Sequence, residues 1–86
     1  MHYVYVIQSE KNKGYIYVGN TGNLKIRLAN HNSGSIYSTK KYKPFRIVYY
    51  EAYLDKKDAL DREHKLKHHG SVIGHLKRRI KRSLNS

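Results

Sequence analysis

The run from Tyr3 to Ile7 constrains the fold more than any other part of this sequence. It reads Tyr-Val-Tyr-Val-Ile, so every position is β-branched or aromatic and none is charged. Such residues favour β-strands, and a strand that is apolar on both faces must be covered on both sides. In a chain of 86 residues, that cover comes from one small domain. We therefore expect a single domain over residues 1–86, with this run as a strand of its sheet.

The next segments predict a hairpin, a helix and a third strand. Lys11 to Gly14 have turn chemistry, and Tyr15 to Val18 resume the β pattern, so they pair with the first strand as a hairpin. Asn23 is expected to cap a helix that ends at Gly34. Phe45 to Tyr53 carry the next β-branched and aromatic run, which predicts the third strand.

Two further helices complete the predicted order. Ser35 to Pro44 show no periodicity and are expected to form a basic loop. Asp55, with Asp58 three residues later, predicts a second helix that starts in the manner of a capping box and runs to Gly70. Ser71 is expected to cap a third helix. The apolar residues that recur along this third helix are Ile73, Leu76, Ile80 and Leu84. The sequence thus predicts an α+β fold in the order β-β-α-β-α-α, with a small three-stranded, mostly antiparallel sheet flanked by helices.

The charge balance indicates a polyanionic partner. Eighteen Lys and Arg stand against six Asp and Glu, a formal net charge of +12, and no acidic residue follows Glu63. Surfaces that serve solubility alone usually mix both signs, so we weigh nucleic acid above a membrane surface, an acidic protein or solubility alone. The residues expected to follow a phosphate backbone without reading sequence are Lys40, Lys41, Lys43, Lys67, Lys77, Arg78, Arg79, Lys81 and Arg82.

Two features that the sequence lacks limit the cellular compartment that we expect for the protein. Without cysteine, the chain forms no disulfide framework and no cysteine zinc site. Its longest apolar run, Tyr3 to Ile7, is far shorter than the roughly 20 residues of a membrane span, and Met1-His2 lead into it without signal-peptide features. We therefore expect a soluble cytoplasmic protein.

Three side chains depart from a purely structural pattern. Glu63 lies four residues after Ala59 and three before Leu66, so it falls along the apolar stripe of the second predicted helix. Because desolvating a lone carboxylate is costly, Glu63 either pairs with a cation at the edge of the stripe or binds a hard divalent cation. Arg27 and His31 are four residues apart and share a helix face, either as two exposed basic residues or as part of a site.

Tyrosines and histidines offer two more candidates. Tyr3 and Tyr5 share one side of the first strand, and Tyr15 and Tyr17 share one side of the second. Tyrosine packs well in sheets, but four on paired strands also favour a hydroxyl-lined wall. The late histidines are His64, His68, His69 and His75. We weigh a transition-metal site there below a phosphate-facing basic helix, because a structural zinc site needs four ligands.

In order and spacing, these residues resemble the GIY-YIG nuclease domain. That family carries Gly-Ile-Tyr on a first strand and Tyr-Ile-Gly on its hairpin partner, followed by an arginine on the next helix. Here the two motifs stand as Tyr3-Val4-Tyr5 and Tyr17-Val18-Gly19, and Arg27 follows eight residues after the second. His31 falls at a frequent histidine position of the family.

The resemblance extends over nearly the whole chain, and it is to the small stand-alone bacterial members. The run Ala59 to Lys67 resembles the helix that carries the family's metal-binding glutamate, which corresponds to Glu63. Two positions depart from the pattern. Tyr3 stands where the first motif has Gly, and the late Asn of many family nucleases has no clear counterpart, since Asn85 is too close to the end.

The resemblance implies a metal-dependent DNA endonuclease with little sequence specificity, with room for selectivity toward DNA structures in repair or processing. Glu63 would hold Mg²⁺ or Mn²⁺, and Arg27 would contact the scissile phosphate. Tyr5 and Tyr17 would line the same cleft, with their hydroxyls near Arg27 and Glu63, and one of them or His31 would take the proton of the attacking water. The expected partner is DNA, with RNA left open, and no membrane. The alternative class is a non-catalytic nucleic-acid-binding module that stacks bases on the tyrosines, followed by a protein-interaction domain.

Overall fold

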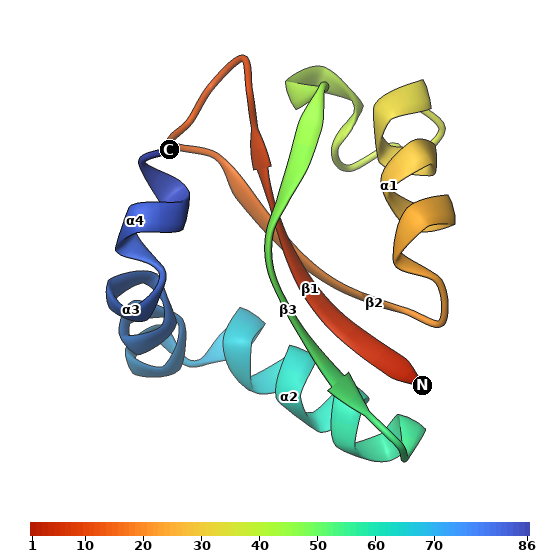
Figure 1. Cartoon of the computed structure of the whole chain (residues 1–86), viewed down its shortest axis with the longest axis vertical. Helices are drawn as coiled ribbons and strands as arrows, with labels where there is room; N and C mark the ends of the chain where they lie inside the picture. Colours follow the sequence, from red (N-terminus) through yellow and green to blue (C-terminus); the bar gives the residue numbers. More distant parts are fainter.

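The three strands form one antiparallel sheet in the computed structural model, which describes residues 1–86. Strand β1 (His2–Ser9) lies in the centre, between β2 (Ile16–Thr21) and β3 (Phe45–Tyr53). Figure 1 shows α1 (Leu24–Ser33) beside one face of this sheet, and the later helices beside the other face. This arrangement confirms the predicted α+β fold and the order of its elements.

Strand β1 is central because both of its faces are apolar. Residues Val4 to Ile7 are all buried. Their side chains alternate between two separate cores, as the period of a strand requires. The core against the later helices holds Val4, Val6, Val18, Ala59, Leu66, Leu76 and Ile80. The core on the α1 side holds Tyr5, Ile7 and Phe45, with Leu24 and Leu28 of α1 packed against it. The sheet is thus covered on both sides.

Helix α1 begins and ends as predicted. The Asn23 side chain accepts a hydrogen bond of 3.1 Å from the Ile26 amide, which satisfies one of the unpaired donors of the first turn. Gly34 follows the helix with φ 80°, a left-handed conformation that glycine adopts without steric cost. In the following loop, Lys40–Tyr42 form one turn of 3₁₀ helix, η1, where an irregular loop was expected.

The second half of the chain differs from the prediction at its helix boundaries. Helix α2 (Lys56–His68) starts after Asp55, whose carboxylate accepts from the Lys57 amide, so Asp58 plays no part in a capping box. Helix α3 (Gly70–Arg79) starts after His69 without a side-chain cap, so the prediction that Ser71 caps it is wrong.

The predicted third helix is interrupted at Ile80, and a short helix α4 (Lys81–Leu84) follows. Ile80 lies at the interruption with φ −106° and ψ 25°, and its side chain remains buried in the core. The Gln8 side chain donates a 2.9 Å hydrogen bond to the Leu84 carbonyl, which ties α4 to β1. The direction of α4 therefore follows from tertiary contacts. No helix of the protein is both long and apolar enough to span a membrane.

Candidate active site

Tyr5, Arg27 and His31 meet on the α1 side of the sheet. The Tyr5 hydroxyl lies 2.7 Å from His31 Nε2 and accepts a hydrogen bond of 3.3 Å from Arg27 Nε. Tyr5 and His31 are 1% and 0% exposed. Arg27 and His31 are four residues apart on α1, so both side chains face the sheet, and the Tyr5 hydroxyl of β1 lies between them.

The hydrogen bonds of this group have a consistent direction. Burial and the neighbouring Arg27 charge lower the pKa of His31 from 6.5 to about 4, so its imidazole is neutral at pH 7 and carries a single N–H. Tyr5 accepts from Arg27, so its own proton is free to be donated to His31 Nε2. His31 Nδ1–H then donates to Thr39 Oγ1 at 2.8 Å. Thr39 is a site residue that the sequence analysis missed, because its loop has no periodic pattern.

Gly19 leaves the space that the Tyr5 ring occupies. It is paired with Tyr5 across the β1–β2 register. A Cβ atom at this position would overlap the Tyr5 hydroxyl and the ring carbon that carries it. The glycine that ends the second motif thus has a steric reason in this protein.

Tyr17 lies at the more open side of the group. Its ring centroid is 5.3 Å from that of His31, and its side chain is half-buried. The Lys67 ammonium group lies 5.0 Å from the centroid of the same ring. Tyr17 therefore connects the buried group on the α1 side with residues of α2, around the edge formed by β2.

Glu63 reaches this edge from the opposite face of the sheet. Helix α2 packs on the core of Val4 and Val18, whereas Tyr5 and Tyr17 pack on the α1 side. Glu63 Oε1 accepts a hydrogen bond of 2.7 Å from Asn20 Nδ2, and Oε2 pairs with Lys67 Nζ at 3.2 Å.

The predicted proximity of Glu63 to the two tyrosine hydroxyls and Arg27 is therefore not one of direct contact, and these residues approach one another from two faces around the β2 edge. No hydrogen bond joins Glu63 to the tyrosines or to Arg27, and Lys67 contacts both the Glu63 carboxylate and the Tyr17 ring. The carboxylate is still within electrostatic range of Tyr5. Burial raises the Tyr5 pKa above its ordinary 10.0, the Arg27 bond offsets part of this rise, and the Glu63 charge adds a small increase. Asn20 is a second residue that the sequence analysis missed, although its position two residues after the buried Val18 places it toward α2.

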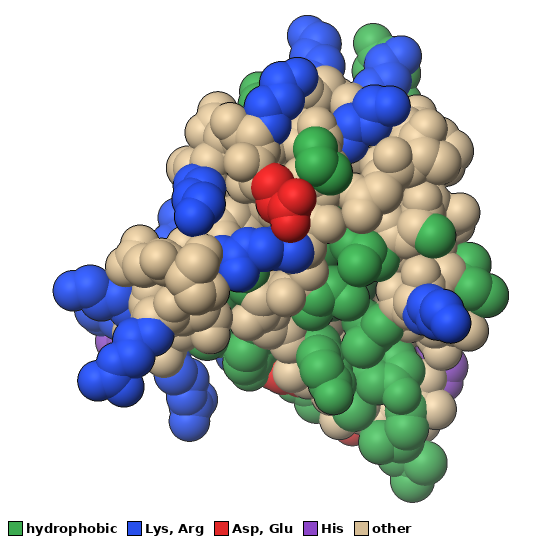
Figure 2. All heavy atoms as spheres, turned by 45° about the horizontal axis from the view of Figure 1, so that its top comes forward, with side chains coloured by type: hydrophobic (Ala, Val, Ile, Leu, Met, Phe, Trp, Pro, Cys, Tyr) green, Lys and Arg blue, Asp and Glu red, His purple; other side chains and the backbone are tan.

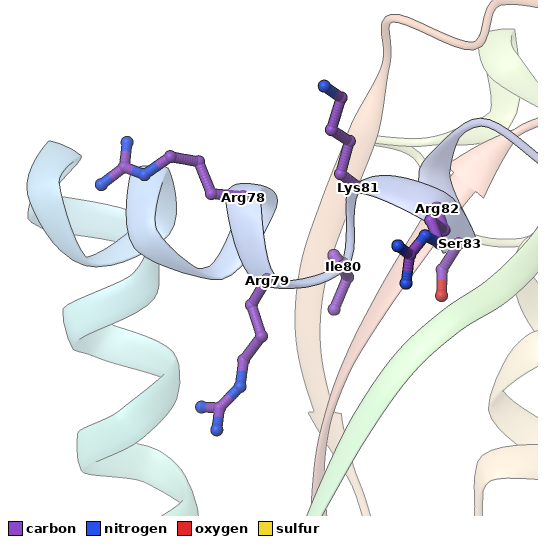
Figure 3. A pocket seen from close by; sticks show the side chains of 6 residues that line it. All are labelled: Arg78, Arg79, Ile80, Lys81, Arg82 and Ser83. Atoms are coloured by element: carbon purple, nitrogen blue, oxygen red, sulfur yellow. The ribbon is translucent and has the colours of Figure 1, made fainter.

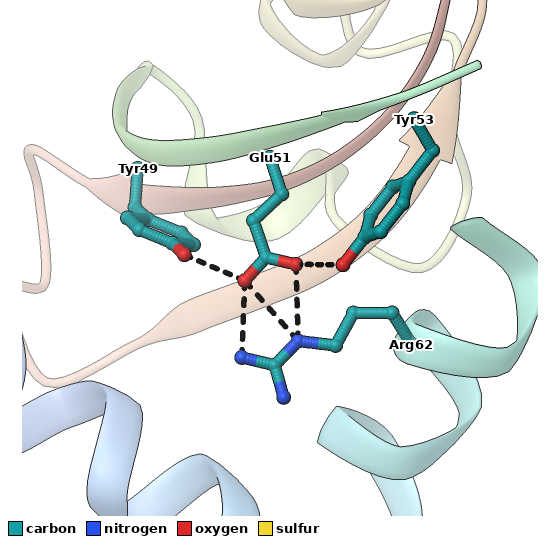
Figure 4. A network of polar contacts seen from close by, with 4 residues as sticks. All are labelled: Tyr49, Glu51, Tyr53 and Arg62. Carbon is teal, nitrogen blue, oxygen red and sulfur yellow. Dashed lines mark hydrogen bonds and ion pairs between the residues drawn. The ribbon is translucent and has the colours of Figure 1, made fainter. Parts of the chain in front are cut away.

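A polar network on β3 fixes the position of α2 (Figure 4). The Glu51 carboxylate accepts from Arg62 Nε and Nη2 at 3.0 Å, from the Tyr49 hydroxyl at 2.6 Å and from the Tyr53 hydroxyl. Burial alone would raise the Glu51 pKa, but these bonds outweigh it and the pKa is lowered. Burial and the bond to Glu51 raise the pKa of Tyr53 to about 12. Because Arg62 directly precedes Glu63, this network also sets where Glu63 lies.

Glu63 and Asn20 offer oxygen atoms of the kind that a hard divalent cation binds. Glu63 supplies a carboxylate, and the amide oxygen of Asn20 makes no hydrogen bond beside it. Mg²⁺ commonly binds one or two carboxylates, several waters and substrate phosphate oxygens, so one carboxylate suffices. No group of three or more His, Asp or Glu side chains gathers in a way that could hold a metal ion. The rings of His64 and His68 lie 4.4 Å apart without forming such a group.

The basic residues expected to follow phosphates are exposed and lie in separate regions. Figure 2 shows Lys and Arg side chains spread over the surface with few acidic ones between them. Lys40, Lys41 and Lys43 lie on and after η1. Lys67 is instead part of the candidate site, through Glu63 and Tyr17.

Four of the remaining basic residues surround the interruption between α3 and α4, whereas Lys77 of α3 lies beside Gln8 and Leu84 instead. A pocket of about 350 Å³ at the interruption is lined by Arg78, Arg79, Ile80, Lys81, Arg82 and Ser83 (Figure 3). We call Arg78, Arg79, Lys81 and Arg82 the basic junction. None of its members pairs with a carboxylate, since the ion pairs of the protein are Arg62–Glu51 and Lys67–Glu63. Its positive charge is therefore available to an anionic partner.

Known proteins share the part of the chain that carries the candidate site. The model of the GIY-YIG catalytic domain matches residues 1–72. A UPF0213 protein of Staphylococcus haemolyticus is 37% identical over 67 residues, which cover 77% of this chain and 79% of the relative. A UPF0213 protein of Lacticaseibacillus paracasei is 38% identical over 69 residues, which cover 78% and 74%. The family match includes Tyr5, Tyr17, Arg27, His31 and Glu63, and the basic junction lies beyond it.

Proposed function

The chain belongs to the GIY-YIG family, and we propose that it is a divalent-metal-dependent endonuclease that hydrolyses DNA phosphodiester bonds with little sequence specificity. The domain of this family is a nuclease domain, which implies a nucleic-acid substrate. The observation that carries the proposal is the hydrogen-bonded group of Arg27, Tyr5 and His31, next to an edge that presents Tyr17 and Glu63. The net charge of +12 supports a polyanionic substrate.

Arg27 is oriented to bind the scissile phosphate. Its Nε donates to Tyr5, and this is the one hydrogen bond of its side chain. The remaining N–H groups of the half-buried guanidinium are thus available for two non-bridging phosphate oxygens. The same contact would stabilise the negative charge that develops during hydrolysis.

We propose that Tyr17 is the residue that orients the attacking water. His31 is fully buried, and both of its nitrogens are engaged by Tyr5 and Thr39. Tyr5 is 1% exposed, and its raised pKa keeps it protonated at neutral pH. These two residues therefore serve best as supports that hold Arg27. Tyr17 is half-buried at the edge, where its hydroxyl oxygen can accept a hydrogen bond from the attacking water and orient it toward the phosphate.

Glu63, with the Asn20 amide oxygen, would hold Mg²⁺ or Mn²⁺ at the same edge. A bound divalent cation would supply Lewis-acid stabilisation of the phosphate. Lys67, which pairs with Glu63 in this structure, would turn toward a substrate phosphate when the carboxylate is engaged.

The alternative is a nucleic-acid-binding module without catalysis, and one observation favours it. The Glu63 carboxylate is already neutralised by Lys67 and bonded to Asn20. In this alternative, Glu63 is a structural residue of α2, and the basic surface binds nucleic acid without cleavage.

Nicking of supercoiled plasmid separates the two functions. We expect nicked circles with Mg²⁺ or Mn²⁺ and none with EDTA, and a branched oligonucleotide tested in parallel measures any selectivity for DNA structure. Tyr17→Phe and Arg27→Ala should lose nicking, whereas Lys25→Ala, which changes an exposed cation of the same helix, should keep it. Binding without nicking by the wild type under every metal condition would favour the binding module.

A further inference from the structure

Two tyrosines on the α1 side of the sheet, Tyr3 and Tyr50, pack against neither hydrophobic core. Tyr50 is paired with Tyr5 across the β1–β3 register, and Tyr3 with Ala52. Tyr50 is 55% exposed, Ala52 is exposed and Tyr3 is half-buried, so α1 leaves this part of its face uncovered.

The rings of Tyr3 and Tyr50 contact one another but not the cores. Their centroids are 5.9 Å apart, with an interplanar angle of 69°, an edge-to-face arrangement that leaves a ring face open. Neither hydroxyl makes a hydrogen bond with the protein, whereas Tyr49 and Tyr53 on the same strand both donate to Glu51. We call Tyr3 and Tyr50 the tyrosine platform.

The tyrosine platform is adjacent to the candidate site. Directly opposed residues of an antiparallel pair point to the same side, with Cβ atoms about 4.5–5.5 Å apart. Tyr50 is therefore the lateral neighbour of Tyr5 at the backbone, whereas the Tyr5 hydroxyl, which accepts from Arg27 Nε, lies over Gly19 of β2. Because neighbouring strands lie about 4.7–4.9 Å apart, β3 is roughly 10 Å from β2, and the sugar and base of a nucleotide next to a phosphate held by Arg27 would extend across that distance to the Tyr50 ring.

We propose that the tyrosine platform stacks an unpaired nucleobase next to the phosphate that Arg27 binds. The inference rests on the proposed function and narrows its substrate class to nucleic acid with at least one unpaired nucleotide beside the scissile phosphate. Bases inside a duplex offer no free face, whereas an unpaired base of any identity can stack on an aromatic ring. This fits a surface without a sequence-reading element.

The charge of the chain argues for this occupant over a second copy of the protein. Each chain carries +12, so two copies that meet at this face would repel each other. Nucleic acid brings phosphates to the cations of the chain, Arg27 among them, together with the base that the ring accepts.

Binding to single-stranded DNA that contains 2-aminopurine tests the proposal without relying on cleavage. We expect wild-type protein and Tyr50→Phe to quench the fluorescence of the stacked base. Tyr50→Leu, which keeps an apolar side chain but no ring, and Tyr50→Ala should lose this quenching and bind about 5- to 150-fold more weakly. The affinity of the Tyr50 variants for fully paired duplex should differ from that of the wild type by less than about twofold. Leu60→Ala, which alters an exposed apolar residue of α2, is the matched control and should behave as wild type.

Three results would overturn the proposal. They are wild-type quenching by Tyr50→Ala, equal behaviour of Tyr50→Leu and Tyr50→Phe, and a dimer in sedimentation that Tyr50→Ala abolishes. Failure of the proposed nuclease function has a different signature, in which Tyr50-dependent quenching persists in wild-type protein that never nicks plasmid.

Discussion

Tyr5 and His31 share a hydrogen bond of 2.7 Å although 26 positions separate them in the chain. Both side chains are buried, and Thr39 on His31 Nδ1 directs the imidazole so that Nε2 accepts from Tyr5. The Tyr5 hydroxyl can then accept from Arg27, which is the residue proposed to bind phosphate. The buried bond therefore helps to orient the Arg27 side chain, which lies closer to the surface.

His31 should make the stability of the protein depend on pH. Its pKa is about 4 in the folded chain against 6.5 ordinarily, so below pH 6.5 the unfolded chain binds a proton that the folded chain does not. The free energy of unfolding should therefore fall as pH drops from about 6.5 toward 4. Urea unfolding across this range measures it, and His31→Gln should show a smaller fall over the same interval. Parallel curves for the two proteins would contradict the assignment.

The Glu51 network should stabilise the attachment of α2. Arg62→Ala leaves a half-buried carboxylate without its guanidinium, and we expect a loss of about 1–3 kcal/mol, toward the lower end because the Arg62 side chain is 29% exposed. Lys65→Ala on the same helix is the control, since Lys65 is exposed and unpaired. A double-mutant cycle with Glu51→Gln measures the coupling of the pair.

Because the Glu51 pKa is lowered, the contribution of Glu51 to the free energy of unfolding is present above about pH 4.5 and disappears as pH falls through the lowered value.

Glu63→Ala should abolish nicking while DNA binding remains. The site loses its one carboxylate, and a negative charge leaves a surface that meets phosphate, so affinity should hold or rise slightly. Glu63 is 16% exposed, but its partner Lys67 is 35% exposed and makes a single contact with it, so we expect a smaller fall in melting temperature than for Arg62→Ala. Circular dichroism melts run beside the nicking assay check both statements. A folded Glu63→Ala protein that nicks at the wild-type rate would refute the role of Glu63.

Gly19→Ala should displace the Tyr5 ring and so weaken the hydrogen bond between its hydroxyl and Arg27. The added Cβ overlaps the phenol, and relief of such overpacking typically costs about 1–3 kcal/mol. Gly22→Ala is a matched control, because nothing lies within 4 Å of the position where its Cβ would stand. Thermal melts and nicking rates of the two variants should differ clearly. Equal melting temperatures would show that the ring has room to move.

The basic junction should contribute to the salt dependence of DNA binding. With about six phosphates neutralised, log K should fall with log salt at a slope near −5, at about −0.9 for each phosphate. Arg78→Ala and Arg82→Ala should each reduce the magnitude of this slope by about 0.9. Titrations of a fluorescent duplex between about 50 and 200 mM salt measure it. A slope that the substitutions leave unchanged would place the duplex elsewhere on the surface.

Sequence patterns predicted the features that depend on neighbouring residues. The alternating side chains of Val4 to Ile7, the cap at Asn23 and the left-handed Gly34 each follow from the geometry of one strand or one helix end. The order of the family motifs pointed to Tyr5 and Arg27, which the fold brings into contact, and to Tyr17, which packs on the same side of the sheet. The same local reasoning predicted one third helix through Leu84, whereas the structure interrupts it at Ile80. No stop signal in the sequence marks this position, and the interruption goes together with the hydrogen bond that ties α4 to β1.

The sequence by itself therefore determined the order of the strands, both ends of α1, the start of α2 and the sign of the net charge, since each follows from short-range sterics or summed charge. Only the tertiary structure decided how the site is assembled. Thr39 reaches His31, and Asn20 meets Glu63 from 43 positions away, because two cores pack on opposite faces of β1 and bring α1 and α2 to the same edge. These contacts depend on strand register and on where each helix packs, which no local pattern encodes.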